Sequence, residues 1–198
     1  MAAAALHKLG RNAEIARHFS AQPAAAMVSI MLQRNFNCPH TSSMGRVFDA
    51  AAGLLGLCDK MEFDAQAAIA LEQDATRYAS RHGMPQALAG GWQIDESGQL
   101  DFLSLLSHLI DVEDAQHGAA LFHATLIAAL GDWVVQAAQY SGMETLVCGG
   151  GCFFNKLLSD GLRKRLAEDG IKMLSAQAMQ PGDTAIALGQ AWVAAQRI

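Results

Sequence analysis

The sequence lacks the features of several large protein classes. No apolar run reaches the roughly 18 residues that cross a membrane. The first residues, 1–8, show no basic segment followed by an apolar core, so they do not resemble a signal peptide. Basic residues are scattered, and the one cluster, 163–165, has no aromatic or basic stripe beside it. We therefore expect a soluble, cytoplasmic protein that binds neither a membrane nor a nucleic acid.

Cysteine is also scarce, with four residues in 198. Only Cys148 and Cys152 lie close together, and their spacing alone does not exclude a metal. No second Cys or His pair with ligand spacing completes a zinc site nearby. Because a disulfide is not expected in a reducing cytosol, we interpret the pair as buried thiols.

Length and composition favour a helix-rich globular protein. A chain of 198 residues can bury one good core, as one domain or two small ones. Apolar residues make up 52% of the sequence, alanine is abundant, and the net charge is −5. Alanine is the strongest helix former, so we expect helices to dominate.

The stretch 145–158 combines the patterns of a strand, a turn and a helix. Residues 145–148 form a short apolar run with two β-branched side chains, which predicts a buried strand. Asn155 then precedes an amphipathic helical pattern. Between them lie three glycines: Gly149, Gly150 and Gly151.

This glycine turn suits a nucleotide phosphate. Glycine permits a positive φ and close approach of a ligand, and the first turn of a helix presents free N–H groups and a positive dipole end. A tight turn without any ligand fits the same residues equally well. The Walker loop and the dinucleotide fingerprint are both absent.

A second notable stretch is the predicted helix 45–57, which carries Asp49 among Phe48 and a run of alanines. A carboxylate on a largely apolar helix is either exposed to solvent or held by a partner. The pattern by itself favours the solvent-facing alternative.

The remaining patterns outline further helices and short strands. Helix is expected over 1–34, with breaks at Gly10 and Pro23, and a loop over 35–45. The later expectations, in chain order, are a helix 63–82, a hairpin 92–102, helices 103–112, 115–140 and 155–168, a strand 171–174, a turn 180–183 and a helix 184–196.

Four segments, taken together, resemble the HypF family, the carbamoyltransferases of nickel–iron hydrogenase maturation. Residues 39–57 are similar to P-x-T-S-S-M-G-R-L-F-D-A-V-A-A-L-L-G-L, and 63–72 to Y-E-G-Q-A-A-x-x-L-E. Residues 145–158 are similar to a strand followed by S-G-G-V-F-x-N-R-L-L, and 181–191 to P-x-x-D-G-G-x-x-L-G-Q-A. The resemblance runs through nearly the whole chain.

The resemblance implies an adenine-nucleotide site for ATP or carbamoyl adenylate. Its expected members are Asp49 and Asn155 near the ribose, Asp64 in support, and Gly149, Gly150 and Gly151 near the phosphate. Two departures weaken the match at the second segment, since Asp64 replaces a glutamate and Ala65 a glycine.

Asp183 has two interpretations. In the related tRNA threonylcarbamoyl transferases (TsaD type), the matching aspartate is a metal ligand, so the resemblance implies a divalent metal at Asp183. Aspartate is also an ordinary helix N-cap, and both roles can hold at once. Thr184 and Ala185 stand where the family has two glycines, and no H-x-x-x-H pair is present to join Asp183.

The implied fold is α/β, a helix-rich lobe of the actin-like ATPase (ribonuclease H-like) fold with a few short strands. Residues 1–198 match the second lobe alone. The acylphosphatase-like, zinc, YrdC-like and first-lobe regions of the family are not represented. We therefore expect a clipped segment, a naturally shortened protein, or one piece of a split enzyme.

The implied activity is transfer of a carbamoyl group from carbamoyl adenylate to the C-terminal cysteine of a HypE-like acceptor. No catalytic residue is expected from this lobe, because the acceptor thiolate attacks, and the lobe alone should be inactive without the first lobe or other HypF regions. The alternative is an inactive remnant that binds a partner or forms a homodimer. A TsaD-like role in tRNA modification is disfavoured, since the motifs follow the HypF pattern and no basic face is visible.

Overall fold

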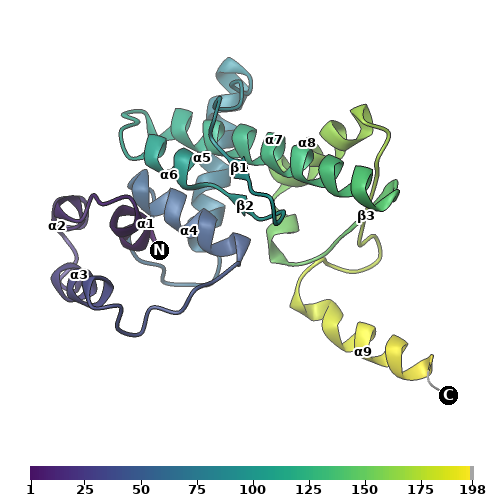
Figure 1. The fold of residues 1–198 in the computed structure, drawn as a ribbon, viewed down its shortest axis with the longest axis horizontal. Helices are drawn as coiled ribbons and strands as arrows, with labels where there is room; N and C mark the ends of the chain where they lie inside the picture. The colour runs from purple at the N-terminus through teal and green to yellow at the C-terminus, as the bar shows by residue number, and fades with distance from the viewer. Residues whose placement is uncertain (197–198) are drawn as a thin grey trace. The chain divides into compact units, whose positions relative to one another are not determined.

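The computed structural model describes residues 1–196, which form two compact units (Figure 1). Unit 1 is Met1–Leu126, and unit 2 begins at Ile127. Helix α7 (Ala115–Ser141) runs through this boundary and contributes its first half to unit 1 and its second half to unit 2. Each unit has a buried apolar core of its own.

Unit 1 is mainly helical and contains one short hairpin. Strands β1 (Gln93–Ile94) and β2 (Leu100–Asp101) pair antiparallel, as the turn signal between them predicts. The elements that precede α7 are α1 (Ala2–Lys8), α2 (Ala13–His18), α3 (Ala25–Gln33), α4 (Met44–Leu54), α5 (Gln66–His82), β1 (Gln93–Ile94), β2 (Leu100–Asp101) and α6 (Leu103–Leu109).

The core of unit 1 forms around Phe48 of α4. Its ring packs edge-to-face on Phe122 of α7, with centroids 5.1 Å apart, and lies 5.8 Å from the ring of His123. All three side chains are buried. An aromatic pair of this kind contributes about 0.5–1.5 kcal/mol beyond the burial of its area. Helix α4 is thereby fixed at the centre of unit 1.

Glycines end several of these helices close to the predicted positions. Gly10, Gly56 and Gly83 follow α1, α4 and α5 with φ of +74°, +69° and +77°, a backbone conformation that favours glycine. The start of α5 differs from the prediction. It begins at Gln66 rather than at residue 63, because Ala65 takes a left-handed conformation and interrupts the helix there.

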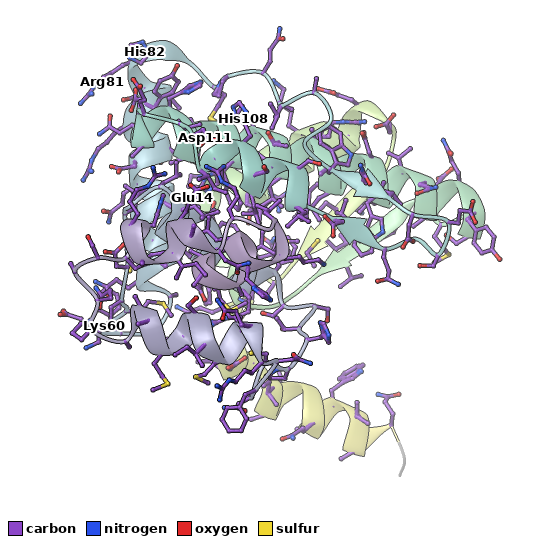
Figure 2. All side chains as sticks on the ribbon, turned by 60° about the vertical axis from the view of Figure 1, so that its left-hand side comes forward. Glu14, Lys60, Arg81, His82, His108 and Asp111 are labelled. Atoms are coloured by element: carbon purple, nitrogen blue, oxygen red, sulfur yellow. The ribbon has the colours of Figure 1, made fainter. Side chains whose placement is uncertain are left out.

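An ion-pair network joins α2 to the segment that follows α6. The guanidinium of Arg11 donates to a carboxylate oxygen of Glu14 and to one of Asp111, both at 2.7 Å from Nη2. Figure 2 shows Glu14 and Asp111 on neighbouring segments. Arg11 holds the pKa of both carboxyl groups below its ordinary value.

Unit 2 is built on a pair of parallel strands. The second half of α7 and the amphipathic α8 (Lys156–Glu168) pack on one face of the pair, where Leu162, Leu166 and Met173 are buried. The elements of unit 2 after α7 are β3 (Thr145–Cys148), the 3-10 helix η1 (Gly151–Phe154), α8 (Lys156–Glu168), β4 (Lys172–Ser175), the 3-10 helix η2 (Asp183–Ala185) and α9 (Ile186–Ala195).

Residues 145–148 form a strand as predicted, but the prediction that this strand is buried is wrong for one of its two faces. Cys148 is buried against α8, but Val147 points to the opposite face and is 76% exposed. Its register partner on β4, Leu174, is exposed as well. The apolar run correctly indicates a strand, whereas burial on both faces requires a second covering layer, which the described residues of unit 2 do not supply.

Helix α7 is long and apolar enough to cross a membrane by length and composition alone, and no other helix of residues 1–196 meets that test. Of its most apolar window, 56% is buried inside the protein. A buried core helix passes the same test. The packing of Phe122 and His123 on Phe48 agrees with a core helix.

Candidate functional site

The two turns that follow β3 and β4 lie side by side in unit 2. The strands are parallel, with Cys148 opposite Ser175, so their carboxyl ends meet at one edge. The Gly150 N–H donates a hydrogen bond to the Pro181 carbonyl, with the nitrogen and oxygen 2.6 Å apart. In open α/β sheets, ligands bind beyond the carboxyl ends of the strands. This edge is therefore the candidate site of unit 2.

The three glycines of the turn differ in what the fold requires of them. Gly150 has φ +103°, which an L side chain rarely adopts. Gly149 and Gly151 do not have a positive φ, and a Cβ added to either would meet no atom of the protein within 4 Å. The backbone and packing of the described residues thus explain a glycine at 150 and not at 149 or 151.

The hydrogen bond to Pro181 changes what the turn can offer an anion. Because the Gly150 N–H already has an acceptor, it is not available to a phosphate while that bond is intact. A phosphate can therefore bind the Gly150 N–H only if the Pro181 carbonyl shifts. Otherwise Gly150 contributes only the shape of the backbone at the turn. Gly149 and Gly151 remain the positions where a ligand could approach closely.

A second close contact locks the two turns together. A methyl group added to Gly182 would lie 2.7 Å from Cε2 of Phe154, the last residue of η1. Phe154 is half exposed, so its ring covers the 181–183 turn while one side faces solvent. The motifs predict both turns, but the sequence does not indicate that Phe154 and Gly182 touch.

Asn155 caps helix α8. Its Oδ1 accepts a hydrogen bond from the Leu158 N–H at 2.9 Å, the contact that an N-cap asparagine makes. The residue is buried. The structure thus gives Asn155 a structural role, and its contact with a ribose stays a prediction.

Asp183 is the first residue of η2, two residues beyond the carbonyl that binds Gly150. It is exposed, and the N-cap position of η2 is occupied by Gly182 rather than by Asp183. Within residues 1–196, no group of three His, Cys, Asp or Glu side chains is arranged to hold a metal ion. A single exposed carboxylate does not make a metal site, so a metal at Asp183 would need ligands from outside the described residues.

Asp49 lies on α4 in unit 1 and is not solvent-facing, so the expectation from its pattern is wrong. Its side chain is 10% exposed, and Nη1 of Arg46 lies 2.9 Å from its Oδ2. The guanidinium is close but not in hydrogen-bonding geometry, so the buried Oδ2 has no hydrogen-bond donor among the described residues. Such an oxygen can accept a hydrogen bond from a ligand hydroxyl.

Asp64 and Ala65 lie just before α5 in unit 1, and both are exposed. Ala65 has φ +60° and ψ +10°, the left-handed region. The position that carries glycine in the family pattern therefore keeps a glycine-like backbone here, although it carries a Cβ. Asp64 precedes the helix instead of lying in its first turn. The helix dipole therefore gives no additional argument for the predicted role of Asp64 beside the nucleotide.

Of the two cysteines near the candidate site, Cys148 is buried and Cys152 is only partly buried, so the interpretation of the pair as buried thiols is wrong for Cys152. Burial raises the pKa of the Cys148 thiol, which keeps it protonated at neutral pH. None of the four cysteines, all of which lie in the described part of the chain, forms a disulfide. The residues of this edge are suited to binding and orienting a ligand rather than to attacking it.

A family model described as "Carbamoyltransferase, Kae1-like Domain, second subdomain" matches residues 1–190. Among curated proteins, the chain is 46% identical to carbamoyltransferase HypF2 of Cupriavidus necator, over 100% of this chain and 27% of that protein. It is also 46% identical to a carbamoyltransferase HypF homolog of the same organism, over 100% of this chain and 52% of that protein. The chain thus spans between a quarter and about half the length of these relatives.

Solved structures show the same fold. A crystal structure of full-length HypF in a phosphate- and nucleotide-bound form matches with a TM-score of 0.77 at 25% identity, over 96% of this chain and 26% of that one. HypF of T. kodakarensis matches with a TM-score of 0.68 at 21% identity, over 91% of this chain and 23% of that one. The second match shows likeness of fold alone.

Proposed function

Because the chain belongs to the HypF family of carbamoyltransferases, as the second subdomain of their Kae1-like domain, we propose that it supplies part of an adenine-nucleotide site used in carbamoyl transfer. The site lies at the edge where the glycine turn meets the 181–183 turn. Support also comes from the related full-length HypF, whose crystal structure is described as phosphate- and nucleotide-bound.

One observation carries this proposal. Gly149 and Gly151 have an ordinary φ and open space where a side chain would point. Nothing in the packing of the described residues excludes alanine at either position, whereas a ligand that approaches the backbone closely would exclude it. The start of a helical segment, which η1 provides after the glycine turn, suits the negative charge of a phosphate.

The chemistry we propose places this chain in a binding role. The thiolate of the acceptor's C-terminal cysteine attacks the carbamoyl carbon of carbamoyl adenylate, so that a carbon–sulfur bond forms. The bond from that carbon to the phosphate oxygen breaks, and AMP leaves. Holding the adenylate in one orientation lowers the barrier by reducing the freedom that the reactants must lose.

Isothermal titration calorimetry of the chain with AMP or ATP tests the proposal. We expect binding to the unchanged chain and at least a tenfold loss of affinity, about 1.4 kcal/mol, in Gly151→Ala. Gly151→Ala should keep the stability of the unchanged chain, and Gly150→Ala, at φ +103°, should lose both stability and binding.

Heat release that is equal in the unchanged chain and in Gly151→Ala would contradict the proposal. So would an absence of binding at millimolar nucleotide in a sample whose circular dichroism shows a folded protein.

A second candidate function is partner binding by a lobe that no longer holds nucleotide. The observation that favours it is Ala65, which adds a side chain at a left-handed position where the family pattern has glycine. If the added Cβ blocks a nucleotide, Ala65→Gly should raise affinity in the same titration. An Ala65→Gly chain that still binds no nucleotide would favour the partner-binding function.

A further inference from the structure

Phe154 is an aromatic side chain that η1 presents at the edge where the two turns of unit 2 meet. The preceding residue, Phe153, packs against the core of unit 2, whereas Phe154 is 53% exposed. A methyl group added to Gly182 would lie 2.7 Å from Cε2 and 3.2 Å from Cζ of the Phe154 ring. The outer end of the ring therefore rests on the 181–183 turn, and the remainder of its surface is open to solvent.

The backbone on both sides of Phe154 is held in place. Before it, the Phe153 N–H donates to the Gly150 carbonyl at 3.1 Å, and the Ser159 hydroxyl donates to the Phe153 carbonyl at 2.8 Å. After it, Asn155 is the buried N-cap of α8. A side chain on a backbone that is already fixed loses less conformational freedom when a ligand binds to it.

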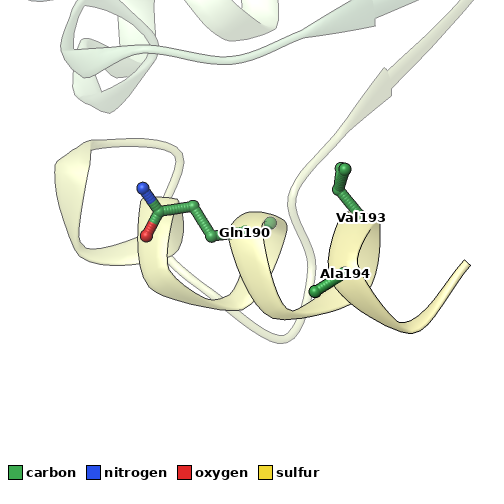
Figure 3. Close-up of a pocket in the computed structure, with 4 residues that line it drawn as sticks. Gln190, Val193 and Ala194 are labelled. Carbon is green, nitrogen blue, oxygen red and sulfur yellow. The ribbon is translucent and has the colours of Figure 1, made fainter. Parts of the chain in front are cut away.

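The apolar hollow beside α9 does not offer a comparable surface (Figure 3). The described residues that line it all belong to that one helix, and none is aromatic: Gly189, Gln190, Val193 and Ala194. No second element among the described residues faces them across the hollow. A planar ring therefore finds an aromatic partner at η1 and not at α9.

We propose that the open face of Phe154 stacks on the adenine base of the nucleotide and so determines specificity for a nucleotide over a bare phosphate. The inference rests on the proposed function, because it requires the phosphate at Gly149 and Gly151. Gly151 is the first residue of η1 and Phe154 is the last, so a ligand anchored at the turn lies beside this short helix.

The chemistry of the two surfaces assigns each to a different part of the ligand. The face of an aromatic ring carries partial negative charge, so it attracts another planar aromatic group and not a phosphate. The start of η1 suits the phosphate instead. Removing an aromatic side chain that stacks on a base typically lowers affinity about tenfold or more.

Calorimetric titration of AMP into the unchanged chain, Phe154→Leu and Phe154→Tyr tests the stacking. Leucine keeps an apolar contact with Gly182 but has no ring, whereas tyrosine keeps the ring. We expect Phe154→Leu to lose affinity about tenfold, and Phe154→Tyr to change it by no more than about threefold.

Proton NMR of AMP distinguishes stacking from a role in holding the two turns together. Adenine protons that lie over an aromatic ring experience its ring current. The H2 and H8 signals of AMP should therefore move upfield on binding to the unchanged chain and to Phe154→Tyr, but not on binding to Phe154→Leu. Loss of a merely structural contact would not produce this pattern.

The matched control is Tyr140→Leu. Tyr140 is 96% exposed on α7 of the same unit, outside the candidate site, so this change should leave the affinity for AMP unaltered. Thermal melts establish that each variant is folded. A folded Phe154→Leu chain that binds AMP as tightly as the unchanged chain would overturn the inference, as would adenine signals that do not move upfield on binding to the unchanged chain.

Failure of the inference is distinguishable from failure of the proposed function. If Gly151→Ala weakens AMP binding and Phe154→Leu does not, the phosphate contact stands and the base contact is overturned. If AMP does not bind, or binds equally to the unchanged chain and to Gly151→Ala, both are overturned.

Discussion

The backbone of Ala65 has a left-handed conformation that is unfavourable for a residue with a Cβ. Its left-handed backbone, with φ +60°, costs an L-residue roughly 1–2 kcal/mol, and glycine recovers most of this while losing about 0.5–1 kcal/mol of chain entropy. We therefore expect Ala65→Gly to stabilise the protein by about 0.5–1 kcal/mol. Urea unfolding measures the change.

The control for this prediction is Ala68→Gly, three residues further along inside α5. There the backbone is right-handed, and glycine should cost about 1 kcal/mol. If both substitutions destabilise the protein equally, Ala65 does not have the conformation described here.

His123 makes unit 1 sensitive to acid. The ring is fully buried, its Nδ1 lies 2.8 Å from the Ala119 carbonyl, and burial lowers its pKa to about 4. In the unfolded chain the pKa is near 6.5, so between pH 6.5 and 4 the unfolded state binds the extra proton. The free energy of unfolding is therefore highest above pH 6.5 and decreases as the pH falls, by up to about 1.4 kcal/mol per pH unit.

Urea midpoints at pH 7, 6 and 5 measure this loss. His123→Gln keeps an N–H donor but does not titrate, so its stability should fall less steeply over the same range. Parallel pH profiles for the two chains would show that another group is responsible.

At the scale of elements, local patterns were enough to predict most boundaries. The amphipathic repeat and the Asp169–Gly170 end predict α8, and the turn residues of 95–98 predict the hairpin. These features depend on neighbours in the sequence. The open face of β3 could not be predicted, because exposure of Val147 depends on which elements cover the sheet.

The candidate site was predictable only in part. The glycine turn and the 181–183 turn each have a local signal, and parallel strands place their ends at one edge. The hydrogen bond from Gly150 to Pro181 and the burial of Asp49 beside Arg46 depend on tertiary geometry and leave no local trace in the sequence. The resemblance predicted that Asp49 contacts a ligand, whereas the sequence pattern around it predicted that its side chain faces solvent.

Gly91 joins three elements of unit 1. Its N–H donates to the Leu88 carbonyl and its own carbonyl accepts from the Leu105 N–H. A Cβ there would lie 2.8 Å from Thr125 Cγ2 and 3.0 Å from the Leu88 carbonyl oxygen, and a backbone oxygen cannot easily move. We expect Gly91→Ala to destabilise the protein by about 1–3 kcal/mol in urea unfolding.

Gly149→Ala is the control for Gly91→Ala, since it has an ordinary φ and open space. It should leave the unfolding midpoint nearly unchanged. Equal midpoints for Gly91→Ala and Gly149→Ala would contradict the packing described for Gly91.

At the scale of the whole molecule, the chain has two units, with exposed apolar elements in the second. It spans only about a quarter of a relative such as carbamoyltransferase HypF2. A binding role at the glycine turn is consistent with a chain that works as part of a larger assembly. The proposed function does not require this chain to supply a nucleophile.

The most direct measurement is a titration of the isotopically labelled chain with AMP, followed through the backbone amide signals by NMR. We expect the signals of Gly149 and Gly151 to shift progressively and saturably, with those of residues 181–183 following because the two turns are bonded together. Signals of the turn that stay unmoved at millimolar AMP, while the spectrum is that of a folded protein, would contradict the proposed nucleotide site.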